Sequence, residues 1–221
     1  GKSSIPSVDS ISIKFLIDDI EAIRQKFKIA KLNILSHSWG SVLATHYSLA
    51  YPDRVKKLIL SDPGMFSREY DEQAAALIAK RSTKEDSVER AQIMSKGTLS
   101  SRDYEELFLL SFRSSAYRKE NLSKIQLKLP ANFGEANNTL FTALMKDQAM
   151  NVNLYDSLSS LKFPVLIIHG EADVLPISSI ERLDDQIPQS ELVLFKESGH
   201  FPFVEEKALF NSTVVDFLER K

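Results

Sequence analysis

The stretch NILSHSWGSVLATHY, from Asn33 to Tyr47, decides how this sequence folds. It opens as a short apolar run and continues with the apolar spacing of a helix. Ser38 stands where one pattern changes into the other, with Ser36 two residues before it and Gly40 two residues after it. This spacing fits the small-x-Ser-x-Gly form of a nucleophile elbow, a sharp turn from strand to helix that exposes a serine hydroxyl.

The elbow carries further expectations about its neighbours. Large side chains at Ser36 or Gly40 would clash across so tight a turn. The turn also directs the Trp39 backbone N–H and the N-terminus of the next helix toward one point, so Trp39 is the expected oxyanion donor. A free serine hydroxyl is a weak nucleophile that needs a neighbouring base. Without such a base, the alternative interpretation is a serine-rich turn that does no chemistry.

Two later strand ends supply an acid and a histidine in the chain order that follows an elbow serine. The apolar run PVLIIHG ends shortly before Asp173, and the run ELVLFKES ends shortly before Gly199 and His200. Parallel sheets hold their sites at the carboxyl ends of the strands, so these residues are expected to meet Ser38. His200 would accept the serine proton, and Asp173 would orient the imidazole ring. Asp62, which follows the run VKKLILS, is the alternative acid.

Strand and helix patterns alternate along the chain, which predicts an α/β fold with a mostly parallel sheet. Four strands are expected to form one contiguous sheet, beginning near Leu32, Lys57, Pro164 and Glu191. Residues 66–155 show helix starts but no convincing strand pattern, and this block is too long for a connector. We therefore expect a core formed by residues 1–65 and 156–221, with an inserted helical cap over residues 66–155.

Within this helical block, two segments have the spacing of a capping box, Thr83–Asp86 and Ser100–Asp103. Each predicts the start of a helix. The aromatic residues of the block are expected to divide between packing inside it and walls of the substrate pocket, and they include Phe108, Phe112, Phe133 and Phe141.

Composition excludes several classes of function. The 221 residues are 43% hydrophobic and 26% charged, which suits one domain with a sizeable core. A net charge of -2 gives no reason to expect nucleic acid or an anionic membrane as a partner. Cysteine is absent and the four histidines are scattered, so we expect neither thiol chemistry nor a metal or other cofactor. The longest apolar runs fall well short of the roughly 18 residues of a membrane span, and we expect a cytoplasmic protein.

Four segments resemble the capped α/β-hydrolase superfamily, namely SHSWGS, YPDRVKKLILSDP, HGEADVLP and SGHFPFVEE. The likeness runs from about Ile11 to Leu218 and is strong in the sheet segments but uninformative in the cap. The HSWG elbow and the HG-x-x-D-x-x-P loop, with Asp173 and Pro176, are most similar to the proline iminopeptidase-like branch.

The resemblance implies a serine hydrolase that acts through an acyl-enzyme on a small molecule or a short peptide. Its triad would be Ser38, Asp173 and His200, with Trp39 in the oxyanion hole. The expected substrate is an N-terminal residue amide, and the alternative within the fold is an ester or a lactone. A different class of alternative is a non-catalytic binding protein or an inactive fragment.

Ser38 comes early for this fold. The nucleophile of the superfamily follows the fifth strand, whereas only 37 residues precede Ser38 here. The resemblance therefore implies that the N-terminal strands, and the loop that supplies a second oxyanion donor, lie outside this chain. A complementary N-terminal fragment is then a candidate partner. The alternative is a complete but rearranged hydrolase fold.

Overall fold

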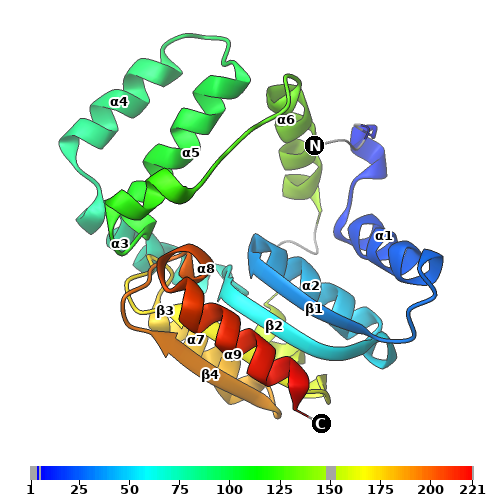
Figure 1. The fold of residues 1–221 in the computed structure, drawn as a ribbon. Coiled ribbons are helices and arrows are strands. Elements are labelled where there is room, and N and C mark those ends of the chain that lie inside the picture. Colours follow the sequence, from blue (N-terminus) through cyan, green and yellow to red (C-terminus); the bar gives the residue numbers. More distant parts are fainter. Residues whose placement is uncertain (1–3, 5, 148–152, 221) are drawn as a thin grey trace.

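A parallel four-stranded sheet lies at the base of the molecule (Figure 1). The computed structural model describes residues 4, 6–147 and 153–220. The strands lie side by side in chain order, as β1 (Leu32–Ser38), β2 (Val55–Pro63), β3 (Val165–Gly170) and β4 (Ser190–Phe195). All three pairings are parallel. The predicted contiguous sheet is confirmed, and only β2 departs by as much as two residues from its expected start.

Helices cover both faces of this sheet. Those that follow or connect its strands are α1 (Ile13–Lys26), α2 (Trp39–Ala50), α7 (Ile177–Gln186), α8 (Pro202–Glu205) and α9 (Lys207–Glu219). Figure 1 shows α9 across one face, while α2 lies behind β1 on the other. None of the helices in the described part of the chain combines the length and apolar character that a membrane crossing requires.

The core follows the two-residue period of the central strands. One set of buried side chains packs with α1, α2 and α7, and it includes Leu58, Leu60, Val165 and Ile167. The alternate set packs with α9 and includes Ile59, Leu166 and Ile168. Strands buried on both faces read as continuous apolar runs, which is why LIL and VLII were recognisable as strands.

The helical block contains α3 (Asp71–Arg81), α4 (Lys84–Met94), α5 (Ser101–Ser115) and α6 (Phe133–Lys146). No strand occurs in its described residues, 66–147 and 153–155. Both predicted capping boxes are present, at the starts of α4 and α5. Figure 1 shows α3, α4 and α5 together above the sheet, while α6 lies between α5, which it contacts, and the N-terminal segment Val8–Ser10. The division of the chain into core and cap at residues 66 and 155 stays a prediction.

Aromatic residues of α5 and α6 contact one another, and one of them contacts a phenylalanine of the core. The Phe108 ring lies 6.2 Å from that of Phe112 and 5.8 Å from that of Phe133, between centroids. Phe112 in turn lies 4.7 Å from Phe201, beside the predicted catalytic histidine. Phe141 is 62% exposed. Phe112 therefore joins the packing of the block to the region of the site.

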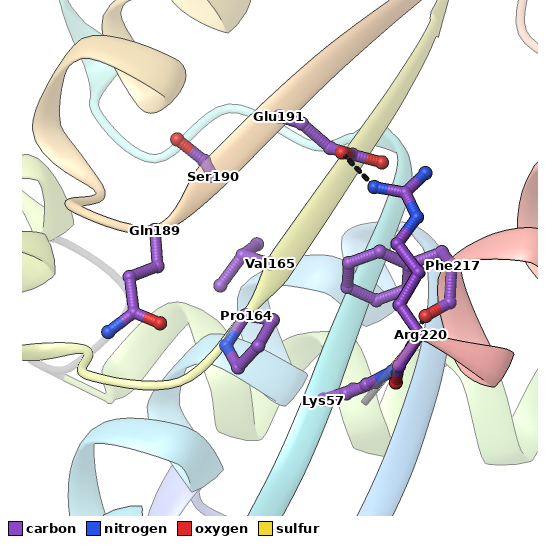
Figure 2. A pocket seen from close by; sticks show the side chains of 8 residues that line it. All are labelled: Lys57, Pro164, Val165, Gln189, Ser190, Glu191, Phe217 and Arg220. Carbon is purple, nitrogen blue, oxygen red and sulfur yellow. Dashed lines mark hydrogen bonds and ion pairs between the residues drawn. The ribbon is translucent and has the colours of Figure 1, made fainter.

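A small hollow of about 190 Å³ lies at the amino ends of β2, β3 and β4, away from their carboxyl ends (Figure 2). The Lys57 ammonium there donates to the carbonyl oxygens of Phe217 at 2.7 Å and Leu218 at 3.1 Å, and also to that of Arg220. The guanidinium of Arg220 pairs with Glu191 at 2.5 Å. Both cations of the hollow are thus engaged in ending α9 and fixing it to the sheet.

Candidate active site

The elbow between β1 and α2 has the geometry expected of a strained turn. Ser38 has φ 54° and ψ -130°, a conformation that L-residues rarely adopt. Such a residue costs about 1–3 kcal/mol and persists only where its surroundings enforce it. Here the Gly64 N–H donates to the Ser38 carbonyl at 2.9 Å, and a Cβ on Gly64 would lie 3.2 Å from the Ser38 backbone. The backbone that directly follows β2 therefore contacts the elbow.

The two small residues of the motif behave differently. The Ser36 hydroxyl is buried and donates to the Ile59 carbonyl at 3.0 Å, so a larger side chain has no room there. A Cβ on Gly40 would meet no atom of the described residues within 4 Å. The size limit expected at Gly40 is therefore absent from the described part of the chain.

Ser38, His200 and Asp173 form a continuous hydrogen-bonded series. The His200 Nε2 atom lies 2.9 Å from Ser38 Oγ, and its Nδ1 atom lies 2.8 Å from Asp173 Oδ2. Asp173 Oδ1 accepts the backbone N–H groups of Val174 at 2.6 Å and Leu175 at 3.3 Å. These donors fix the carboxylate and leave its other oxygen for the imidazole. The arrangement has the atoms and order that a serine nucleophile, a base and an orienting acid require.

Trp39 is the first residue of α2 and directly follows Ser38. The first N–H groups of a helix have no partner within the helix and carry its positive dipole end. The Trp39 N–H is therefore available to an anion that forms next to Ser38 Oγ. The Trp39 side chain is 36% exposed beside the same turn.

His37, the residue before Ser38, contacts the backbone and the ring of His200. Its Nε2–H donates to the His200 carbonyl at 2.7 Å, and the two rings lie 4.7 Å apart between centroids. The Phe203 ring packs edge-on against it at 5.0 Å. Burial, aided by the nearby charge of His200, lowers the pKa of His37 to about 4. His37 is consequently neutral at pH 7, and its hydrogen bond holds the backbone carbonyl of His200 in place.

Asp62, the alternative acid, lies beneath the site and faces a different histidine. Its side chain is fully buried and accepts the Gly170 N–H at 2.9 Å. The nearest imidazole atom is His169 Nδ1, 3.5 Å from Asp62 and 3.9 Å from Asp173. Burial and the neighbouring Asp173 raise the pKa of the Asp62 carboxyl well above its usual value. Asp62 faces His169, whereas Asp173 makes the 2.8 Å hydrogen bond with His200, so the geometry favours Asp173 as the orienting acid.

Asp62, His169 and Asp173 also have the residue types of a metal site, and their ligand atoms lie within 4.8 Å of one another. An ion bound there would compete with His200 for the Asp173 carboxylate. The observed 2.8 Å bond between His200 and Asp173 favours the hydrogen-bonded arrangement instead. We therefore interpret the cluster as two buried carboxyl groups whose mutual repulsion helps to raise the pKa of Asp62.

Three backbone segments meet behind His200. A Cβ on Gly170 would lie 2.2 Å from the Gly199 carbonyl oxygen, and one on Gly199 would lie 2.0 Å from the Ser115 carbonyl oxygen. The Ala172 N–H donates to the Ser198 carbonyl at 2.9 Å, which joins the loop before Asp173 to the turn before His200. Only glycine allows backbones to approach this closely.

The sequence analysis did not single out Glu205, which follows His200 by five residues and does not cap α9. Instead the Glu205 carboxylate accepts the Gly199 N–H at 2.7 Å and the Tyr117 N–H at 2.9 Å. Because Tyr117 lies 88 residues from Glu205, no local pattern could have indicated this contact.

The sequence profile of the α/β hydrolase fold family matches residues 1–207 of the chain. The chain is an α/β hydrolase. Its relatives place it in the proline iminopeptidase-like branch, as the elbow and acid-loop motifs predicted. One relative is the proline iminopeptidase of Heyndrickxia coagulans, 24% identical over 99% of this chain and 77% of its own length.

Solved structures of other hydrolases have the same fold. An α/β fold family hydrolase from Bacillus anthracis strain Sterne superposes with a TM-score of 0.77 and 26% identity, over 98% of this chain and 78% of that one. Est816, described as an N-acyl homoserine lactone degrading enzyme, superposes with a TM-score of 0.65 and 24% identity, over 98% and 78%. The family thus establishes a hydrolase that acts on small molecules or peptides.

Proposed function

We propose that this α/β hydrolase is a serine hydrolase whose nucleophile, base and acid are Ser38, His200 and Asp173. The observation that carries the proposal is the unbroken series of hydrogen bonds, 2.9 Å from Ser38 Oγ to His200 and 2.8 Å from His200 to Asp173. Hydrogen-bond reach between nucleophile, base and orienting acid is the requirement for activating a serine hydroxyl.

Acylation would begin when Ser38 Oγ attacks the substrate carbonyl carbon and its proton passes to His200 Nε2. The carbonyl oxygen becomes an oxyanion, which the Trp39 N–H and the helix dipole would stabilise. Asp173 stays ionised and stabilises the imidazolium. When the tetrahedral intermediate collapses, His200 returns the proton to the leaving amine or alcohol, and an ester to Ser38 remains.

Deacylation would repeat these steps with water as the nucleophile. His200 Nε2 removes a proton from water, whose oxygen attacks the acyl-enzyme carbonyl. Collapse of the second intermediate releases the carboxylic acid and returns the proton to Ser38 Oγ. Since the same imidazole serves both halves, a mobile His200 would slow both.

As substrate we propose an N-terminal residue amide, with proline the first candidate. The support is the proline iminopeptidase of Heyndrickxia coagulans, which aligns with 99% of this chain. A second candidate is an ester or a lactone, favoured by the fold likeness to the lactone-degrading Est816. The two differ in leaving group, because an amine must be protonated by His200 whereas an alkoxide needs this less.

A fluorophosphonate probe tests the nucleophile, because it forms a stable bond only with an activated serine. The wild-type protein should be labelled at Ser38, and Ser38→Ala should not. Ser212→Ala, a change on exposed α9, is the matched control and should be labelled as the wild type is. A folded wild-type protein that resists the probe would refute the proposal and favour a binding protein. Turnover of a proline arylamide, short-chain aryl esters and an acyl homoserine lactone would then rank the substrates.

A further inference from the structure

The Glu205 side chain, at the end of α8, receives hydrogen bonds from two separate parts of the molecule. Its Oε1 atom accepts the N–H groups of Tyr117 at 2.9 Å and Arg118 at 3.2 Å, and the Asn121 side chain lies 3.3 Å away. These donors belong to residues 115–121, a segment that begins at the last residue of α5 in the helical block. One oxygen of the carboxylate is thus devoted to that segment.

The other oxygen faces the catalytic side. Glu205 Oε2 accepts the Gly199 N–H at 2.7 Å, and the Ser198 hydroxyl approaches it at 3.5 Å. We call residues 196–200 the histidine turn. Only a carboxylate can accept backbone N–H groups on both oxygens, and hydrogen bonds to an ionised acceptor are stronger than those between neutral groups. The chemistry of the side chain therefore matches its place between two sets of donors.

The histidine turn also contacts the segment 115–121 directly. The His200 N–H donates to the Ser115 carbonyl at 2.8 Å. From α3, the Arg81 guanidinium donates to the carbonyl oxygens of Ala116 and Ala172, the second of which precedes Asp173. The segment is thereby joined to the loops that carry both the base and the acid. His200 has no such tie to the segment through its own imidazole.

We propose that Glu205 is a positioning residue that fixes His200 by holding the histidine turn against the segment 115–121. The inference rests on the proposed function, in which His200 is the base. Glu205 does not touch the reacting atoms, so its effect passes through the Gly199 backbone. We call these hydrogen bonds of Glu205 the clamp. Without the clamp, the His200 imidazole could move out of hydrogen-bond reach of Ser38 and Asp173. A misplacement of about 1 Å in a catalytic group can reduce turnover about 100-fold.

Glu205→Gln is the sharpest test, because glutamine has nearly the same shape. Its single carbonyl oxygen can serve either the segment or the turn, and its NH₂ group would face N–H donors on the other side. We expect kcat for an aryl ester to fall roughly 10- to 100-fold with KM changed less than about twofold. Glu206→Gln is the matched control: among the described residues its carboxylate accepts one backbone N–H, that of Glu197 at 2.9 Å, and a glutamine oxygen can still accept it.

Amide hydrogen exchange separates this inference from the proposed function. Glu205→Gln should speed the exchange of Gly199 and of Tyr117 or Arg118, whether or not the protein turns over an ester. If Glu205→Gln exchanges faster but the wild-type protein never reacts with fluorophosphonate, the structural role of Glu205 is supported and the proposed function is refuted. Unchanged kcat in a wild-type-like active variant would overturn the positioning role.

A second variant covers the case in which Glu205→Gln does not fold. Asn121→Ala removes one side-chain donor on the segment side and leaves the carboxylate in place. It should lower kcat by a smaller factor, roughly 2- to 5-fold, without a matching change in KM. A rise in KM with kcat unchanged would show that the segment 115–121 contributes to substrate binding and does not position His200.

Discussion

β1 and β3 are both apolar parallel strands that end beside the candidate triad, yet they differ in how they are buried. Every residue of β3 is buried, because β2 and β4 flank it and helices cover both faces. β1 pairs with β2 alone among the described strands, and Leu35 in it is 51% exposed. Similar local sequences thus contribute differently to stability, and position in the sheet decides how much.

The largest expected effect is a loss of turnover from a substitution in the loop after β3, which carries Asp173. Asp173→Asn should reduce kcat about 10,000-fold, since an amide cannot stabilise the imidazolium and would favour the wrong imidazole tautomer. Stability should change little, because the amide oxygen can still accept the Val174 N–H. Steady-state kinetics and circular dichroism would measure both. A fall of less than tenfold would point to Asp62 as the working acid.

A core truncation in β3 tests the buried side of the comparison. Ile167 is fully buried between β2 and β4, so Ile167→Ala leaves a cavity among packed side chains. We expect the free energy of unfolding to fall by about 2–5 kcal/mol, measured by urea denaturation. A loss below 1 kcal/mol would mean that the centre of the sheet can collapse around the missing atoms.

The end of β1 should make stability depend on pH through His37. Burial lowers the pKa of this imidazole from 6.5 to about 4. Between these pH values His37 is therefore mostly protonated in the unfolded chain and mostly neutral in the folded protein. The stabilisation is present above pH 6.5 and is lost as the pH falls toward 4, by roughly 3 kcal/mol.

Chemical denaturation at a series of pH values would measure this loss. His37→Gln retains an N–H donor for the His200 carbonyl but does not titrate, so its stability should fall less steeply over the same range. Parallel curves for the wild type and the variant would contradict the role given to His37.

The smallest expected effect is at the open edge of the sheet. Leu35→Ala in β1 removes a half-exposed side chain, and the free energy of unfolding should change by less than about 1 kcal/mol. A loss as large as that for Ile167→Ala would show that the outer edge of β1 is covered in the protein under study. Urea denaturation of the two variants side by side makes the comparison quantitative.

The features predicted well from the sequence depend on neighbouring residues. The elbow around Ser38, with a helix directly after it, follows from local spacing, and the structure reproduces both. The capping boxes of α4 and α5 are equally local. Ser38, Asp173 and His200 each stand at or shortly after the end of a strand, so their meeting at one sheet edge could be expected, because parallel strands end together.

The features that escaped prediction depend on contacts between distant residues. Glu205 bonds Tyr117, 88 residues away, and His37 bonds the His200 carbonyl, 163 residues away. The burial of Asp62 beneath Asp173 likewise follows from the pairing of β2 with β3 and from no pattern in either strand. A histidine or a glutamate in sequence reads as a surface residue until its partners are placed beside it.

The close approach of backbone segments at Gly170 and Gly199 limits which substitutions this region of the molecule can accept during evolution. Even one methyl group at either position would lie 2.0–2.2 Å from a carbonyl oxygen of the next segment. Surrounding loops can vary in length and residue type, but at these two points a substitution must displace the backbone that carries the acid or the base. New substrate preferences are therefore more accessible through changes in the helical block than through rearrangement of the loops beneath it.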